Sequence, residues 1–185
     1  MLIEIQFSHE IEFGYPKLRC AIDENAPFYD GNSQTHITAD INVAPGFHEL
    51  VITHYNKQAG DQLIDSQGKI VKDKYVQIEN IKIDNIAFRI EELREGHFYP
   101  VYNLDYVNDC KKQGIILPYS ISPNLYLGHN GTWKLNFYTP FIDYIIKKRQ
   151  EHSINLDNTI FQSDTELLAR AKAWFNQVPD IIWKP

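Results

Sequence analysis

The chain has 185 residues and a formal net charge of −6, and 43% of its residues are hydrophobic. This composition supports one packed domain, or one domain with an appendage, and argues against disorder, because disordered segments are poor in aromatic and branched residues. The negative charge argues against a nucleic-acid partner, whose phosphates require a basic surface. No continuous apolar stretch reaches the length of a membrane span, so we expect no membrane insertion.

The amino terminus predicts a strand and not an export signal. Its first ten residues, MLIEIQFSHE, alternate apolar and polar side chains and lack both a basic start and a long apolar core. We therefore expect cytoplasmic synthesis without a signal peptide. Cys20 and Cys110 are expected to be free thiols in that compartment, although the sequence alone leaves a disulfide between them open.

The first two thirds of the chain are typical of short β-strands separated by turns. Apolar and polar residues alternate over residues 3–7, 18–22, 37–43, 48–55, 76–79 and 81–84. Turn residues such as Gly14-Tyr15-Pro16 and Asp30-Gly31-Asn32 lie between these stretches. Short strands at this spacing predict an antiparallel β-sandwich or jelly roll.

Two turns predict β-hairpins. Pro45-Gly46 is expected to join the strands at 37–43 and 48–55. Asn130-Gly131 is expected to join 125–127 to 132–137, because both residues tolerate positive φ. Residues 91–95 are either a helical turn or a charged excursion, and the polar stretch 103–113 is predicted to be a loop.

Helical periodicity follows near the carboxyl end. Residues 139–152 start with Thr139 as a cap and Pro140 at the first helical position, and residues 163–178 carry a second apolar stripe. We therefore predict a mainly β fold, an antiparallel sandwich or jelly roll with two C-terminal α-helices. The β-sandwich domain would span residues 1–138, and the helical extension 139–185 would pack on the sandwich or on a partner.

Catalytic motifs do not occur in the sequence. It contains no G-x-S-x-G elbow, no phosphate-binding glycine loop and no H-E-x-x-H zinc helix. A glycosidase with two carboxylates stays open, because its acids are set by geometry and not by local spacing. The sequence thus favours a protein that is not an enzyme.

The polar segment 56–73 is a candidate calcium site. Calcium prefers oxygen ligands, and Asp61, Asp65 and Asp73 could supply them. A structural interpretation competes with this one, because loop aspartates commonly serve turns. In that case Asp61 stabilises a turn after Gly60, Asp65 caps the turn at residues 67–68, and Asp73 pairs with Lys72 or Lys74.

A second acidic loop, residues 23–32, mixes carboxylates with aromatic side chains. Aromatic rings can pack on the C–H faces of a sugar while planar polar groups bind its hydroxyls. We therefore predict Tyr29 of this loop, together with Tyr55 and Asn56 at the start of the segment 56–73, as carbohydrate-binding residues. The alternative is that the aromatic side chains of this loop fold back into the core.

The sequence Pro45-Gly46-Phe47-His48-Glu49-Leu50-Val51-Ile52, together with Asn56, Asp73 and the strand at 81–85, resembles calcium-dependent xylan-binding modules. The resemblance spans about residues 45–88. It implies a non-catalytic β-sandwich in which a loop-bound calcium contacts sugar hydroxyls. Lys57 stands where that family carries an acidic residue, which leaves Asp61 or Asp65 as substitutes.

In general character the chain is also similar to accessory proteins of tailed-phage particles. That similarity implies a location in the virion, with a glycan, a neighbouring virion subunit or another copy of the chain as partner. The sequence thus predicts a carbohydrate-binding-like module of a phage or virus particle. The alternatives are a structural assembly protein without a small ligand, which docks through its helices and Ile181-Ile182-Trp183, and a small glycan-processing enzyme.

Overall fold

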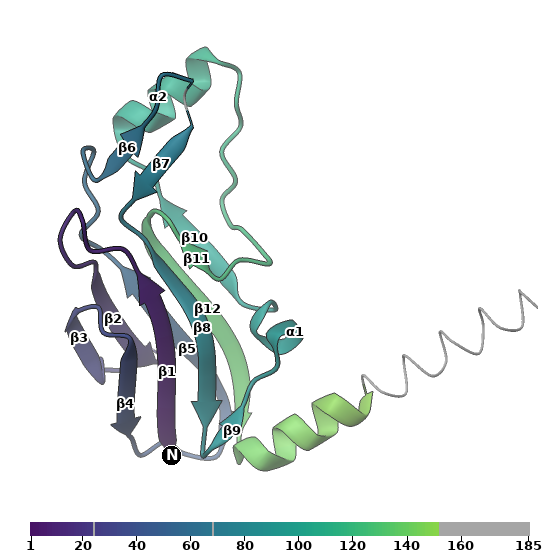
Figure 1. Cartoon of the computed structure of the whole chain (residues 1–185). Helices are drawn as coiled ribbons and strands as arrows, with labels where there is room; N and C mark the ends of the chain where they lie inside the picture. Colours follow the sequence, from purple (N-terminus) through teal and green to yellow (C-terminus); the bar gives the residue numbers. More distant parts are fainter. Residues whose placement is uncertain (24, 68, 152–185) are drawn as a thin grey trace, which may run out of the picture. The chain divides into compact units, whose positions relative to one another are not determined.

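The computed structural model describes residues 1–23, 25–67 and 69–151 (Figure 1). The chain divides into two compact units, Met1–Ile142 and Asp143–Pro185. In the described part of the chain, no helix is long and apolar enough to cross a bilayer. The helix predicted at 163–178 and the terminal residues 181–183 lie outside the described residues.

The first unit contains two five-stranded sheets, both antiparallel (Figure 1). Sheet A has the order β11 (Tyr126–Leu127), β8 (Val76–Ile83), β1 (Leu2–His9) and β4 (His36–Asp40), and β9 (Ile86–Ala87) also pairs with β8. Sheet B has the order β10 (His97–Val101), β12 (Asn130–Thr139), β5 (Gly46–His54), β2 (Lys17–Ile22) and β3 (Tyr29–Asn32). A separate hairpin consists of β6 (Gln62–Ile64) and β7 (Ile70–Asp73).

The core lies between the two sheets. Alternate residues of each strand are buried, as the pleat of a β-strand requires. They include Ile3 and Ile5 of β1, Leu50 and Ile52 of β5, and Trp133 of β12, all with no exposed surface. The prediction of a mainly β, antiparallel sandwich is therefore confirmed. Cys20 and Cys110 are buried free thiols.

Both predicted hairpins were wrong. The strand before Pro45-Gly46, β4, pairs with β1 in sheet A, whereas the strand after it, β5, belongs to sheet B. Likewise β11 pairs with β8 in sheet A, and β12 pairs with β5 and β10 in sheet B. Gly46 and Gly131 have φ values of +145° and +150°, far from the left-handed helical values of a two-residue hairpin turn. Each turn passes the chain from one sheet to the other.

Two short helices follow β9 in the chain: α1 (Ile90–Leu93) precedes β10, and α2 (Leu104–Lys112) follows it. The prediction of a loop over 103–113 was therefore wrong. The Asn103 side chain accepts a 2.7 Å hydrogen bond from the Tyr106 backbone N–H and caps α2. Because only Cys110 of this helix is buried, the segment lacks the apolar stripe by which a helix is recognised in a sequence.

The last described helix begins later than the sequence predicts. Strand β12 continues to Thr139, and the helix runs from residue 141 to residue 151, the last described residue. The Thr139 hydroxyl donates to the Ala44 carbonyl at 2.8 Å and accepts from the Gly46 N–H at 3.1 Å. Thr139 thus ties the end of β12 to the start of β5 and does not cap a helix.

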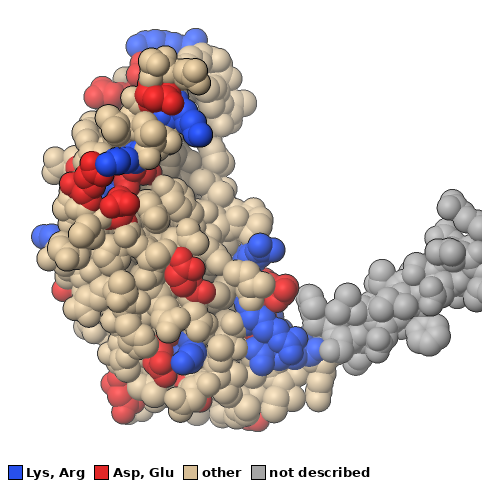
Figure 2. Space-filling view, viewed as in Figure 1, with Lys and Arg blue, Asp and Glu red and all other residues tan. Residues whose placement is uncertain are grey.

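Charged side chains of both signs are interspersed over the face shown in Figure 2. Several form ion pairs, such as Lys82 with Glu4 at 3.4 Å on sheet A. Pairs of this exposed kind contribute little to stability.

Candidate functional site

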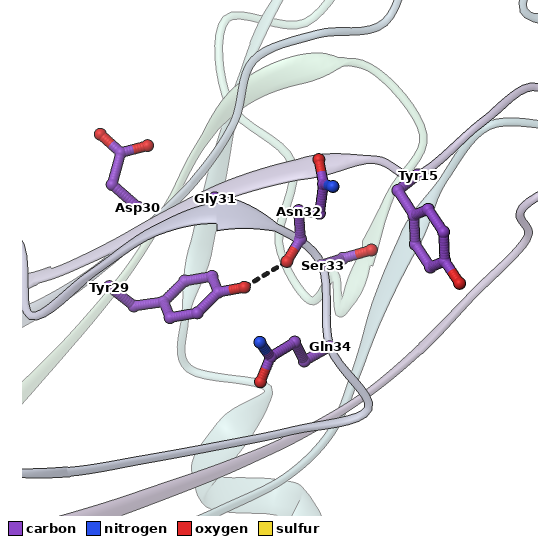
Figure 3. Close-up of a pocket in the computed structure, with 7 residues that line it drawn as sticks. All are labelled: Tyr15, Tyr29, Asp30, Gly31, Asn32, Ser33 and Gln34. Atoms are coloured by element: carbon purple, nitrogen blue, oxygen red, sulfur yellow. Dashed lines mark hydrogen bonds between the residues drawn. The ribbon is translucent and has the colours of Figure 1, made fainter.

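A hollow of about 480 Å³ lies at the edge of sheet B where β3 ends (Figure 3). Its lining residues are Tyr15, Tyr29, Asp30, Gly31, Asn32, Ser33 and Gln34. Most of them come from β3 and from the connection between β3 and β4, which passes from sheet B to sheet A. Tyr15 comes from the connection between β1 and β2, so segments that are separate in the sequence build one site.

Both aromatic and polar residues line this hollow. Tyr15 is 51% exposed, and Tyr29 is half-buried with its hydroxyl donating to the Asn32 carbonyl oxygen. Burial raises the pKa of Tyr29, which keeps its hydroxyl neutral. Figure 3 shows the Tyr29 ring and the Gln34 amide on one side of the strand and Asp30 on the other.

The Ser33 hydroxyl is a buried polar group in the lining. Ser33 is 3% exposed, and its Oγ has no hydrogen-bond partner in the described part of the chain. Its backbone N–H donates to the Pro16 carbonyl at 2.7 Å, which fixes its position next to the Tyr15 turn. A buried hydroxyl without a partner costs about 1–3 kcal/mol.

Asp30 is held by side chains from β2 and the end of β5. The Tyr55 hydroxyl donates to its Oδ1 at 2.6 Å, and Arg19 Nε donates to its Oδ2 at 3.0 Å. The Arg19 guanidinium also lies 5.7 Å from the centre of the Tyr55 ring. The hydrogen bond from Tyr55, with the bond and charge of Arg19, lowers the pKa of Asp30, and the same bond raises the pKa of Tyr55.

Asn56 supports the other end of the hollow. Its Oδ1 accepts from the Lys17 N–H at 2.7 Å, and its Nδ2 donates to the Tyr15 carbonyl at 3.0 Å. Of the three predicted carbohydrate-binding residues, Tyr29 thus lines the hollow, whereas Tyr55 and Asn56 hold the lining residues Asp30 and Tyr15. Their role toward a sugar stays a prediction.

Sequence reasoning missed Tyr15, Ser33 and Gln34. The turn Gly14-Tyr15-Pro16 was recognised as a turn, but not as the position of an aromatic binding residue. A large ring in a tight surface turn is a usable signal, because such a residue is not needed for the core. Ser33 and Gln34 carry no comparable signal in the sequence.

The predicted calcium ligands lie around the β6–β7 hairpin, and the structure gives Asp61 and Asp65 other partners. Asp65 Oδ1 accepts from the N–H groups of Gln67 and Lys69, both at 2.9 Å, and so caps the hairpin turn. Asp61 Oδ2 accepts from the Gln58 N–H and from Lys74 Nζ, both at 3.0 Å.

Asp73 belongs to a buried polar cluster at the base of the same hairpin. Lys57 Nζ donates to its Oδ1 and to the Gly128 carbonyl, and the Tyr126 hydroxyl donates to its Oδ2 at 3.0 Å. Among residues 1–23, 25–67 and 69–151, no three His, Cys, Asp or Glu side chains are arranged to hold a metal ion.

All three aspartates thus have partners within the chain, and their role as calcium ligands stays a prediction. Asp61 and Asp73 are each neutralised by a lysine ammonium group, from Lys74 and Lys57, and Asp65 is used by the turn. The structural interpretation gave the correct roles to Asp61 and Asp65. For Asp73 it named Lys72 or Lys74 as the partner, whereas the partner is Lys57.

Comparisons with known proteins gave one distant similarity. No family model matches the chain, and no curated protein matches it. A solved structure described as "vCBM60 in complex with galactobiose" is similar, with 12% sequence identity and a TM-score of 0.44. The similarity covers 74% of this chain and 99% of that one. It is too distant to assign a ligand.

Proposed function

We propose that the protein is a non-catalytic carbohydrate-binding module whose site is the hollow at the end of β3. The observation that supports this most is the combination of groups in its lining. Two tyrosines, an asparagine, a glutamine and a serine line one hollow, and the Asp30 carboxylate lies on the other side of the same strand. Rings pack against the C–H faces of a sugar, and the polar groups can bind its hydroxyls.

The protonation state of the Asp30 side chain favours binding over catalysis. A general acid of a glycosidase needs a raised pKa, so that it carries a proton at neutral pH. The pKa of Asp30 is lowered instead, by the hydrogen bond from Tyr55 and by Arg19. A carboxylate held in the charged form accepts hydrogen bonds from sugar hydroxyls but has no proton to give.

Tyr15→Ala is the variant that tests this site. We expect the wild-type protein to be retained by at least one neutral polysaccharide in affinity electrophoresis. The variant should bind that glycan about tenfold more weakly, which corresponds to about 1.4 kcal/mol and is a reasonable loss for one aromatic contact. Titration calorimetry with the matching oligosaccharide gives the dissociation constants.

The matched control is Tyr138→Ala on β12. Tyr138 and Tyr15 are both 51% exposed, but Tyr138 does not line the hollow. It should therefore leave glycan binding unchanged. If no glycan is retained, or if both variants lose binding equally while their thermal unfolding stays normal, the proposed function is wrong.

A specific observation also favours the second candidate, a structural assembly protein. On the β6–β7 hairpin, Leu63, Ile64, Ile70 and Val71 are each at least half exposed. Clustered exposed apolar side chains of this kind mark protein interfaces. The predicted place in a phage or virus particle would provide such a neighbour.

Light scattering after size-exclusion chromatography separates the two candidates. An assembly protein should form a defined oligomer that dissociates when Ile64 and Ile70 are both replaced by Thr. Thermal unfolding of this double variant should remain cooperative, because both side chains are exposed. A monomer at all concentrations would remove the support for self-assembly and leave the carbohydrate-binding proposal in place.

A further inference from the structure

We infer that the carbohydrate ligand is a linear, uncharged oligosaccharide that lies across the outer face of sheet B. It would run from the hollow at β3 to a second hollow at β10. This inference rests on the proposed function and adds the length, the direction and the charge class of the ligand.

The second hollow has a volume of about 150 Å³ and lies over β5, β12 and β10. Its lining residues are Glu49, Glu95, His97, Tyr99, Lys134, Leu135 and Asn136. Tyr99 makes an edge-to-face contact with Tyr119, with ring centres 5.7 Å apart. Tyr119 is 85% exposed, so this end of the sheet also offers an aromatic surface to a ligand.

A straight cross-strand row of five residues joins the two hollows. The strand register pairs Asp30 with Arg19, Arg19 with Thr53, Thr53 with Thr132, and Thr132 with Tyr99. Asp30 belongs to the strand that bounds the first hollow, with its carboxylate on the outer face, and Tyr99 lines the second hollow. Since neighbouring strands are about 4.8 Å apart, the row extends over roughly 19 Å. A single sugar unit would not span this distance, but a short linear oligosaccharide would.

The row faces away from the core. Its members alternate along their strands with inward residues such as Leu18, Ile52, Trp133 and Phe98, which are all buried. The outward side chains are a carboxylate, a guanidinium, two hydroxyls and a phenol. Thr53 Oγ1 and Thr132 Oγ1 lie 3.2 Å apart, so the middle of the row presents two adjacent hydroxyl groups. A ligand with many hydroxyl groups matches this chemistry along its length.

The charges on this face indicate an uncharged ligand. Arg19 pairs with Asp30 at 3.0 Å, and Lys134 pairs with Glu49 at 2.6 Å. Lys17 also lies on this face of β2 and makes no ion pair in the described part of the chain, so a single cation near the row is left for an anion. A polyanion such as a polyuronic acid or a nucleic acid would require cations that are not already neutralised by neighbouring carboxylates. A peptide strand would bind to a free sheet edge, whereas this row crosses the middle of a sheet whose strands are paired with one another.

The test is the double substitution Thr53→Val and Thr132→Val. Valine keeps the branched shape, and replacing both hydroxyls of a pair by groups of the same shape is nearly neutral for stability. The probes are xylo-oligosaccharides and galacto-oligosaccharides of increasing length. The control is Thr38→Val on β4, an exposed threonine of sheet A that lies outside the row.

We expect the affinity of the wild-type protein to rise with oligosaccharide length and then to level off. The double variant should bind the shortest ligands as the wild type does and the longest ones about three- to tenfold more weakly, as expected for one or two lost hydrogen bonds. Thr38→Val should behave like the wild type. An equal loss at every length would overturn the inference.

Other outcomes separate this inference from the proposed function. If affinity does not change with length while Tyr15→Ala still weakens binding, the hollow at β3 is the site and the row is not. If Tyr15→Ala has no effect on any glycan, the proposed function fails and the inference fails with it. Tighter binding of a uronic-acid oligomer or of a peptide would overturn the inference that the ligand is an uncharged oligosaccharide.

Discussion

Lys57→Met should lower the free energy of unfolding by about 3–5 kcal/mol, the usual cost of removing one partner of a buried ion pair. The side chains of Lys57 and Asp73 are only 11% and 8% exposed. Without the ammonium group, the Asp73 carboxylate keeps one hydrogen bond from Tyr126 but loses the charge that balances it. The Gly128 carbonyl loses its donor as well.

Urea denaturation measures this change, and Lys72→Met is the matched control. Lys72 pairs with Glu12 at the surface, where both side chains are nearly half exposed, so its loss should cost less than about 1 kcal/mol. Adding Asp73→Asn to Lys57→Met should recover part of the stability, because the charge without a partner is then removed. If Lys57→Met and Lys72→Met had the same small effect, the buried pair would not be a main support of this end of the sandwich.

The same measurement addresses calcium. Lys57 already binds Asp73, and Lys74 already binds Asp61, so a cation would have to displace an ammonium group to reach either carboxylate. The calcium prediction stays a prediction. An increase of the wild-type unfolding midpoint on adding calcium would support it, because a ligand that binds only the native state stabilises that state.

The strands could be predicted from the sequence because the pleat itself produces the pattern. Residues such as Leu50 and Ile52 are buried and alternate with half-buried neighbours whatever sheet they join. The partner of each strand could not be predicted in the same way. Pro45-Gly46 and Asn130-Gly131 indicate where the chain turns, but not whether it returns to the same sheet or crosses to the other one.

The candidate site was predicted only in part, because the pairing of distant strands and loops brings its residues together. Tyr29 was found through the composition of its own loop. Tyr15 and Ser33 meet in space because the Ser33 N–H reaches the Pro16 carbonyl and Asn56 reaches Tyr15, and neither link has a local sequence pattern. The cross-strand row is a stronger example, since its five members come from five strands.

Lys57 shows what a departure from a family pattern can mean. The resemblance to xylan-binding modules places an acidic residue at this position, and this chain has a lysine there. In the structure Lys57 supplies the positive charge beside Asp73. Asn130 holds the backbone of Lys57 in place through two 2.8 Å hydrogen bonds, one with the Lys57 N–H and one with its carbonyl. A cation of the chain itself thus lies beside one of the three predicted calcium ligands.

Acid should destabilise the protein through His54, by about 3 kcal/mol between pH 7 and pH 4. His54 has no exposed surface, and its Nδ1 lies 3.2 and 3.1 Å from the Leu127 and His129 carbonyl oxygens. Burial lowers the pKa of His54 to about 4, and the nearby charges of Lys57 and Lys74 act in the same direction. The unfolded chain has the ordinary pKa of about 6.5, and each unit of difference is worth about 1.4 kcal/mol.

The sign follows from which state binds the proton. Between pH 6.5 and pH 4 the His54 side chain is protonated in the unfolded chain and neutral in the folded one, so unfolding takes up a proton and becomes easier as the pH falls. Above pH 6.5 the side chain is neutral in both states, and its effect on the pH dependence disappears. Below about pH 4 the folded state is protonated too, and the loss is complete.

His54→Asn should flatten this part of the stability curve. An asparagine amide can still donate to the carbonyl oxygens but does not titrate, so urea midpoints of the variant should fall less between pH 7 and pH 4 than those of the wild type. His36→Asn is the control, because the His36 side chain is 46% exposed and should leave the wild-type slope unchanged. Parallel curves for the wild type and His54→Asn would show that another group causes the acid sensitivity.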